Sequence, residues 1–329
     1  MVGGYVRLQR AQASLSDWKP SSWLYPKDDS DWQYEYQLYM KSYSSRLFPK
    51  ALDLAQFRDL YNWDWLHRTY AQGLGVYIGL PLLGLWGKLG GRVKGYMLTA
   101  AGVGGLMGAV GWFQVYHGLV SPTLPAPEST PLHKAIHQSF GLTLYSLLLW
   151  AGLTQLHPDT ATFIKTLARL KIAQQQRRKY IQALPFLAGT LATGGLVAAR
   201  GAGKMLVNWP FYDESWLFPV SGFDLGPGFR NFTENNAMVQ FCHRTCSYLT
   251  ALAVFSLWKV SRGAPFGVAA ARFSLLAVSL QLISGVVTLT HYSPWDKSLA
   301  HEALSMVVLT SLLVGLHRVR KPVNIKSLI

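Results

Sequence analysis

Seven apolar stretches, each long enough to cross a lipid bilayer as a helix, recur along the 329 residues of this chain. A hydrocarbon core of ~30 Å requires about 20 apolar residues in helical form. Half of the residues are hydrophobic and only 14% are charged, which is too few charges for a soluble protein of this length. The sequence therefore predicts an all-α integral membrane protein whose transmembrane helices cover residues 69–88, 97–119, 134–155, 182–203, 237–258, 265–289 and 299–316.

Basic residues crowd alternate loops, which indicates how the helices are oriented. Fifteen Lys and Arg residues fall in one set of loops, 88–95, 156–180, 259–263 and 317–329. Only four fall in the opposite set, 118–134, 204–234 and 291–298. Because loops rich in Lys and Arg stay on the cytoplasmic side, we expect the C-terminus on the matrix or cytoplasmic side. The net charge of +15 then reflects topology, and no nucleic-acid binding is expected.

A short polar pattern occurs twice, and it indicates an internal repeat. His67-Arg68-Thr69 opens one apolar helix and His243-Arg244-Thr245 opens another; each is followed at similar spacing by a second histidine, His137 or His301. Further matched pairs are Gly3-Gly4 with Gly194-Gly195, and His117 with His291. Such repeats predict two similar helical bundles related by a pseudo-symmetry axis.

The two halves differ in their number of helices. Gly194-Gly195 lies inside the predicted helix 182–203, whereas Gly3-Gly4 lies at the start of the chain, so seven spans (3+4) stand where the repeat predicts eight. Three explanations stay open: a truncated sequence, a helix supplied by another polypeptide, or a first half that works with three helices. The predicted division is an N-terminal extramembrane segment or lid at 1–62, a first transmembrane half-bundle at 63–155, a basic loop at 156–181 and a second half-bundle at 182–329.

The four matched histidines are the candidate ligands of a metal or haem. A histidine in an apolar helix is costly unless its ring nitrogens have partners. Four of them at matched repeat positions and at one membrane depth favour ligation over the alternative, a satisfied structural role. Because imidazole is a common axial ligand of haem in helical bundles, the sequence predicts one haem between His67 and His137 and another between His243 and His301.

Polar residues beside these histidines distinguish the two halves. Asp64 lies three residues before His67, where the second half has Gln240 before His243. A carboxylate one helical turn from the ligand can accept a proton or orient water, which predicts catalysis in the first half; the alternative is a helix N-terminal charge near the interface. Arg68 and Arg244 either pair with haem propionates or extend to lipid headgroups.

These residues resemble the haem A synthase family of the cytochrome oxidase assembly pathway, in its mitochondrial and proteobacterial branch. The likeness covers nearly the whole chain. It is carried by Gly3-Gly4 through Val6-Arg7-Leu8 to Trp18-Lys19-Pro20, Asp64-Trp65-Leu66-His67-Arg68, Gly194 through Gly203 to Trp209-Pro210, Arg230-Asn231-Phe232, and Glu234-Asn235 through Val239-Gln240-Phe241 to His243-Arg244.

The resemblance implies an eight-helix protein of two four-helix halves that oxidises the methyl group of haem O to a formyl group through successive hydroxylations. The product, haem A, serves cytochrome c oxidase. It implies a substrate haem in the first half and a haem b in the second, with four axial ligands, His67, His137, His243 and His301. It also implies the mitochondrial inner membrane or a bacterial plasma membrane, an electron donor such as a ferredoxin, and contacts with oxidase assembly factors.

The chain departs from the family at several positions. Asp64 replaces the family's essential glutamate, Cys242 replaces an aspartate, and Glu302 replaces a glutamine. The ligand histidines remain while other positions differ, so a second hypothesis is a non-catalytic haem-binding or structural subunit, or an assembly factor, associated with a respiratory complex. A third is a bis-histidine quinone or electron-transfer cytochrome.

Overall fold

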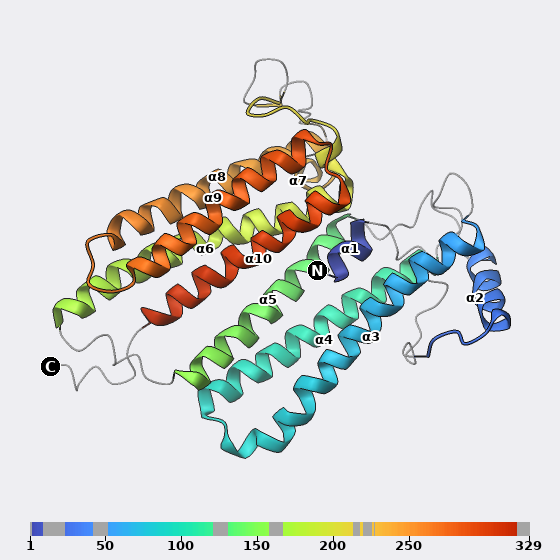
Figure 1. Ribbon diagram of the computed structural model, residues 1–329, viewed down its shortest axis with the longest axis horizontal. Coiled ribbons are helices and arrows are strands. Elements are labelled where there is room, and N and C mark those ends of the chain that lie inside the picture. The colour runs from blue at the N-terminus through green and yellow to red at the C-terminus, as the bar shows by residue number, and fades with distance from the viewer. Residues whose placement is uncertain are drawn as a thin grey trace. The chain divides into compact units, whose positions relative to one another are not determined.

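The computed structural model describes residues 2–8, 24–41, 52–120, 131–157, 167–212, 218–219, 226 and 228–320. Throughout these residues the chain forms helices joined by turns, without a strand, which confirms the predicted all-α membrane fold. The longer elements in Figure 1 are α2 (Asp29–Lys41), α3 (Leu54–Leu85), α4 (Gly91–Val120), α5 (Pro131–Leu156), α6 (Leu167–Arg200), α8 (Asn236–Ser261), α9 (Val268–Thr290) and α10 (Trp295–Arg318). The short helices are α1 (Val2–Leu8) and α7 (Asn231–Glu234).

Each of the seven predicted spans corresponds to one long helix, from α3 to α6 and from α8 to α10, although the spans 69–88, 182–203 and 265–289 each extend three residues beyond their helix. Within the described part of the chain, five helices are long and apolar enough to cross a membrane: α4, α5, α6, α9 and α10. α3 and α8 are also long enough, but they carry the two His-Arg-Thr triplets and further polar residues, which lower their mean hydropathy. The histidine-bearing triplets therefore lie on the more polar helix of each half.

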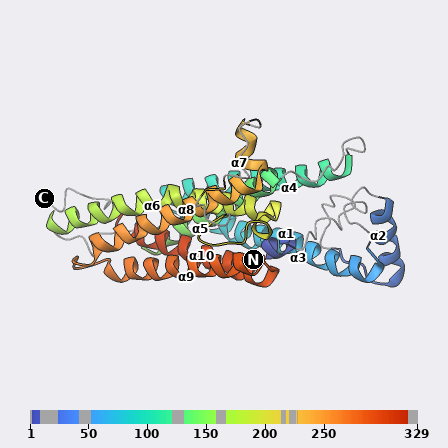
Figure 2. The ribbon, with the colours of Figure 1, turned by 90° about the horizontal axis from the view of Figure 1, so that it is seen from above.

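The chain divides into two compact units. The first contains residues 1–89 and 105–137, and the second contains residues 90–104 and 138–329. In the second unit α6, α8, α9 and α10 run side by side in both views (Figures 1 and 2). The division of the chain into a lid, two half-bundles and a basic loop stays a prediction.

The core of the second unit is built from the facing stripes of these four helices. Its fully buried side chains include Tyr180 on α6, Leu257 on α8 and Leu312 on α10. The Tyr180 ring fills the space beside Gly315 of α10, where any side chain would overlap its phenol group. α5 joins this core through a hydrogen bond of 2.6 Å between the Tyr145 and Thr310 hydroxyl groups.

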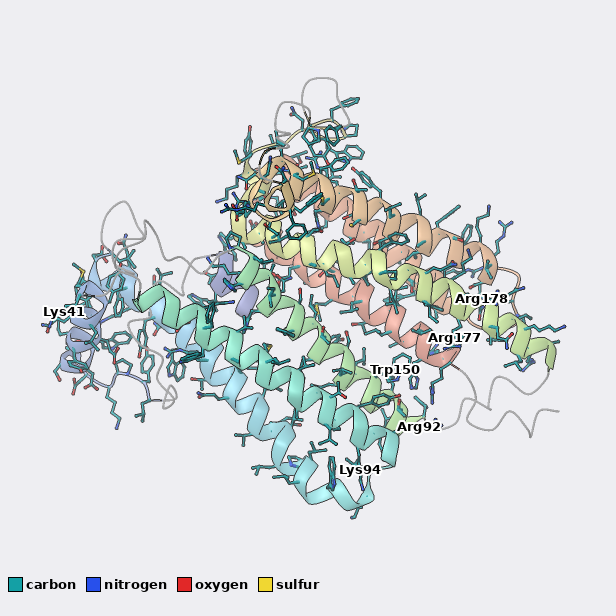
Figure 3. The ribbon with its side chains drawn as sticks, turned by 180° about the vertical axis from the view of Figure 1, so that it is seen from behind. Lys41, Arg92, Lys94, Trp150, Arg177 and Arg178 are labelled. Atoms are coloured by element: carbon teal, nitrogen blue, oxygen red, sulfur yellow. The ribbon has the colours of Figure 1, made fainter. Side chains whose placement is uncertain are left out.

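Basic residues lie along the ends of helices in this second unit. Figure 3 shows Arg92 and Lys94 at the start of α4 and Arg177 and Arg178 on the first half of α6. These residues precede the most apolar part of their helices, as expected of charges that flank a membrane span.

In the first unit, an aromatic cluster holds α2 against the start of α3. Trp32 and Tyr39 of α2 pack with Phe57 and Tyr61 of α3. α3 begins in a capping box, in which the Asp53 carboxylate accepts from the Gln56 amide N–H and the Gln56 side chain accepts from the Asp53 N–H. α3 continues without a break from this cluster into the first predicted span.

The two units differ in how well their first long histidine-bearing helix is covered. Residues 70–77 of α3 are all exposed, whereas Thr250, Val254 and Leu257 of α8 are buried, with α6 packed along that helix. α1 packs against α3 but is only 7 residues long. It contributes the Gly3 contact described below and leaves residues 70–77 of α3 exposed.

We predict that Gly315→Ala destabilises the second unit, because the added methyl group overlaps the buried Tyr180 ring. Overpacking a close-packed core costs ~1–3 kcal/mol, so the unfolding temperature in detergent should fall. Gly152→Ala on α5 is the matched control, since no atom lies within 4 Å of its added Cβ. An equal unfolding temperature for both variants would contradict the packing described for Tyr180.

Candidate haem-binding site

His243 of α8 and His301 of α10 face each other inside the second unit. Their ring centroids are 6.4 Å apart and their planes are nearly perpendicular, at 85°. Two metal–imidazole bonds of roughly 2 Å each, together with the two ring half-widths, place the centroids about 6 Å apart. The pair therefore has the separation that one iron held between two imidazoles requires.

The His243 ring is held by α6. Its Nδ1 lies 3.0 Å from the Thr190 carbonyl oxygen and 3.3 Å from the Thr193 hydroxyl group. A carbonyl can only accept, so Nδ1 carries the proton and Nε2 is left with its lone pair, ready to bind a metal. Gly194 lets the two helices approach, because a Cβ at this position would lie 3.1 Å from His243 Cε1.

The His301 ring is held by α9 in a related way. A Cβ on Gly285 would lie 3.0 Å from His301 Cε1. The Gln281 side-chain nitrogen lies 3.3 Å from His301 Nε2. His301 Nδ1 and Gln281 Oε1 are buried, and neither has a hydrogen-bond partner within the described part of the chain. Orphaned polar atoms of this kind are a feature of sites that bind a further group.

The first unit repeats this arrangement. His137 of α5 places Nδ1 3.1 Å from the Met107 carbonyl oxygen of α4, and a Cβ on Gly111 would lie 3.3 Å from its Cε1. His67 of α3 lies against α1, where a Cβ on Gly3 would lie 3.1 Å from its Nε2.

The donor set fits a haem better than a directly bound ion. Among the residues that the structure describes, no group of three or more His, Cys, Asp or Glu side chains could hold a metal ion. Two facing imidazoles, as in the second unit, are what a porphyrin iron takes above and below its plane, since the porphyrin supplies the other ligands. Cys242 and Cys246 are free thiols.

Beside His67 and His243, two polar side chains one helical turn apart contact each other, Asp64 with Arg68 and Gln240 with Arg244. Asp64 is 2% exposed and its carboxylate lies 2.8 Å from Arg68 Nε. In the second unit Gln240, also 2% exposed, accepts a short hydrogen bond from Arg244. The halves therefore differ as the sequence indicated: the first unit has a buried ion pair at this place, and the second unit has a neutral acceptor beside its arginine.

The two arginines use their donors differently. Arg244 donates to the carbonyl oxygens of Leu206 (2.8 Å) and Phe211 (3.3 Å) and stacks 4.1 Å over the Tyr212 ring. Burial raises the pKa of Tyr212, and the charge of Arg244 opposes part of that shift. Arg68, by contrast, keeps its Nη1 buried and without a hydrogen-bond partner in the described residues. Arg68 therefore has a donor left for an anion, whereas Arg244 holds the loop after α6.

The sequence did not predict which glycines and backbone carbonyls contact the imidazole rings. Gly111 and Gly285 were missed, although they are separated by the same 174 positions as His117 and His291. That shared offset was a usable signal. The backbone carbonyl of Met107 left no signal, because any residue type supplies a carbonyl.

Comparison with known proteins identifies the family of this chain. A family described as "Cytochrome oxidase assembly protein" (COX15-CtaA) matches residues 1–313. The chain belongs to this family. Its relatives include "Heme A synthase" of Methylobacterium sp. (strain 4-46), 35% identical over 94% of this chain and 84% of the relative. "Heme A synthase COX15" of Arabidopsis thaliana is 28% identical over 98% of this chain and 71% of the relative, and that of Saccharomyces cerevisiae is 28% identical over 98% and 72%. No solved structure matches the chain significantly.

We predict that Arg244→Lys loosens the loop at 205–212. An ammonium group cannot donate at three separated points as the guanidinium does, so amide hydrogen exchange in this loop should accelerate. The control is Arg230→Lys, which alters an exposed pair with Glu234 at 3.1 Å and should leave exchange unchanged. Equal exchange rates at 205–212 in the wild type and Arg244→Lys would show that Arg244 does not hold this loop.

Proposed function

We propose that this chain is a haem A synthase, an oxidoreductase that converts the methyl group of haem O into the formyl group of haem A for cytochrome oxidase. Membership of the family and the names of the relatives support this function. The observation that carries it is the His243–His301 pair, because its centroid separation of 6.4 Å suits a bis-imidazole haem site inside a membrane protein.

The residues divide into two haem sites in this proposal. His243 and His301 hold a haem b in the second unit, which supplies electron transfer when bound. His67 and His137 hold the substrate haem in the first unit. Arg68 offers its unpaired Nη1 to a propionate. Arg244 stays a candidate for the second propionate contact, although both its Nη atoms already donate to loop and side-chain oxygens.

Asp64 is the proposed catalytic residue. Its buried carboxylate lies one turn from His67, on the same face of α3. Arg68 Nε lies 2.8 Å from this carboxylate and offsets part of the cost of burying its charge. Such a group accepts a proton from water, or stabilises positive charge, beside the methyl group that is oxidised. The neutral Gln240 at the matching place suits a site that holds haem without oxidising it.

The proposal extends to the surroundings of the enzyme. We place this multi-pass protein in the mitochondrial inner membrane or a bacterial plasma membrane, with its C-terminus on the matrix or cytoplasmic side. The excess of Lys and Arg in alternate loops supports that orientation. An external electron donor such as a ferredoxin supplies the electrons, and oxidase assembly factors receive the product. No feature of the described residues favours the non-catalytic hypothesis.

Removal of either second-unit histidine should release the haem of that unit. Because loss of a hydrogen bond that supports a ligand already costs 10–100-fold in metal affinity, loss of the ligand in His243→Ala or His301→Ala should cost more than about tenfold. Haem content per purified protein, measured from the pyridine haemochrome, reports the loss. His291→Ala, an exposed histidine at the end of α9, is the control that should keep its haem. Full haem content in both test variants would remove this pair from the site.

Asp64→Asn separates haem binding from oxidation. The amide keeps the shape of the side chain but loses the charge and the basicity, so haem A formation should fall by at least about 100-fold, in the range of general-base catalysis. Haem content should remain, since both ligands of the first unit are intact. Asp64→Glu, which restores a carboxylate, should retain conversion. Unchanged conversion in Asp64→Asn would exclude Asp64 from the mechanism.

A further inference from the structure

Two of the four histidines meet the same pair of groups on the neighbouring helix. For His243 these are the Thr190 carbonyl and Gly194, and for His137 they are the Met107 carbonyl and Gly111. In each case the glycine follows the carbonyl by four residues, so the two lie one turn apart on one helix face. The spacing recurs in α4 and α6, which belong to different halves of the repeat.

His301 shares only the glycine of this pair, which is Gly285. Its Nδ1 has no hydrogen-bond partner among the described residues, and its Nε2 lies 3.3 Å from the Gln281 side-chain nitrogen. In all three cases the ring atom nearest the glycine is Cε1, at 3.0–3.3 Å from where a Cβ would stand. The same edge of the imidazole therefore approaches the glycine each time, and at His243 the Nε2 atom is farther from the Gly194 Cβ position (4.0 Å) than Nδ1 is (3.4 Å).

We propose that each carbonyl–glycine pair is a positioning device that fixes which nitrogen of the histidine binds iron and where its ring sits. The carbonyl holds the proton on Nδ1, so Nε2 keeps its lone pair. The glycine sets how deeply the ring can approach the helix, and thereby how far Nε2 projects toward the iron. Met107, Gly111, Thr190, Gly194 and Gly285 are positioning residues in this sense. The inference rests on the proposed haem ligation by these histidines.

A Cβ at these glycines has a defined effect. Contacts of 3.0–3.4 Å force the neighbour to move by a few tenths of an ångström. A moved ring changes the orientation of the imidazole plane at the iron. It also weakens the Nδ1–H hydrogen bond, and loss of such a bond costs 10–100-fold in metal affinity. Gly194→Ala should therefore weaken haem binding by about tenfold.

The chain offers a control on the same helix pair. A Cβ on Gly189 of α6 would lie 3.1 Å from the Cys246 sulfur of α8, as close as the Gly194 Cβ would lie to His243. Gly189→Ala therefore disturbs the α6–α8 packing equally without touching an imidazole. In the first unit, Gly108→Ala on α4 has no atom within 4 Å and serves as the control for Gly111→Ala.

The experiment compares the full-length haem-loaded variants by electron paramagnetic resonance, reduction potential and haem affinity. Gly194→Ala should change the g-values and the potential of the second-unit haem, and Gly111→Ala those of the first-unit haem, while Gly189→Ala and Gly108→Ala match the wild type. A Gly194→Val variant should enlarge the shift. These spectroscopic readouts report ring orientation, which a loss of packing alone does not alter.

The outcomes separate this inference from the proposed function. If His243→Ala loses its haem but Gly194→Ala and Gly194→Val keep the wild-type spectrum and affinity, the positioning device is wrong and the haem site stands. Equal shifts in Gly189→Ala and Gly194→Ala would also overturn it, because general packing would then explain both. If His243→Ala keeps its haem and spectrum, the site assignment fails and the inference fails with it.

Discussion

The structure depends on satisfying the polar atoms of imidazole rings that are buried between apolar helices. A buried polar ring is stable only when its nitrogens are occupied and its bulk has room, and a membrane offers no water to satisfy it. The neighbouring helix supplies a carbonyl for Nδ1 and a glycine gap for the ring edge, as at His243 and His137. The remaining nitrogen then faces the space between the helices, where a second histidine approaches from the other side.

The internal repeat makes this arrangement twice, and the chemistry differs at one residue. Asp64 and Arg68 form a buried ion pair, whereas Gln240 and Arg244 form a neutral–cation pair at the same positions of the repeat. A buried ion pair costs desolvation that a neutral acceptor avoids, so its presence in only one half points to a role beyond stability. In the proposed function, this contrast distinguishes a half that oxidises its haem from a half that holds one.

Much of this could be predicted from the sequence, because membrane helices and internal repeats leave long-range patterns. The all-α fold, the long helices, the paired histidines and the Asp64–Gln240 contrast follow from hydropathy and from residues at matched positions, whereas α3 and α8 are less apolar than a predicted membrane span. The backbone carbonyls and glycines that contact the imidazole rings could not be predicted in the same way. A carbonyl such as that of Met107 has no residue signature, and Gly111 is one of several glycines in α4, of which Gly108 meets nothing. The hydrogen bonds from Arg244 to the 205–212 loop could not be predicted either, because their acceptors are backbone oxygens.

Extraction and chromatography of the haems from the purified protein, expressed in cells that make haem O, tests the central claim most directly. The account predicts haem A, or a hydroxylated intermediate between haem O and haem A, together with haem b. Haem A would show that the first unit oxidises its substrate with Asp64 in place of glutamate. Haem b alone, or no haem, would contradict the account and favour a structural or assembly subunit.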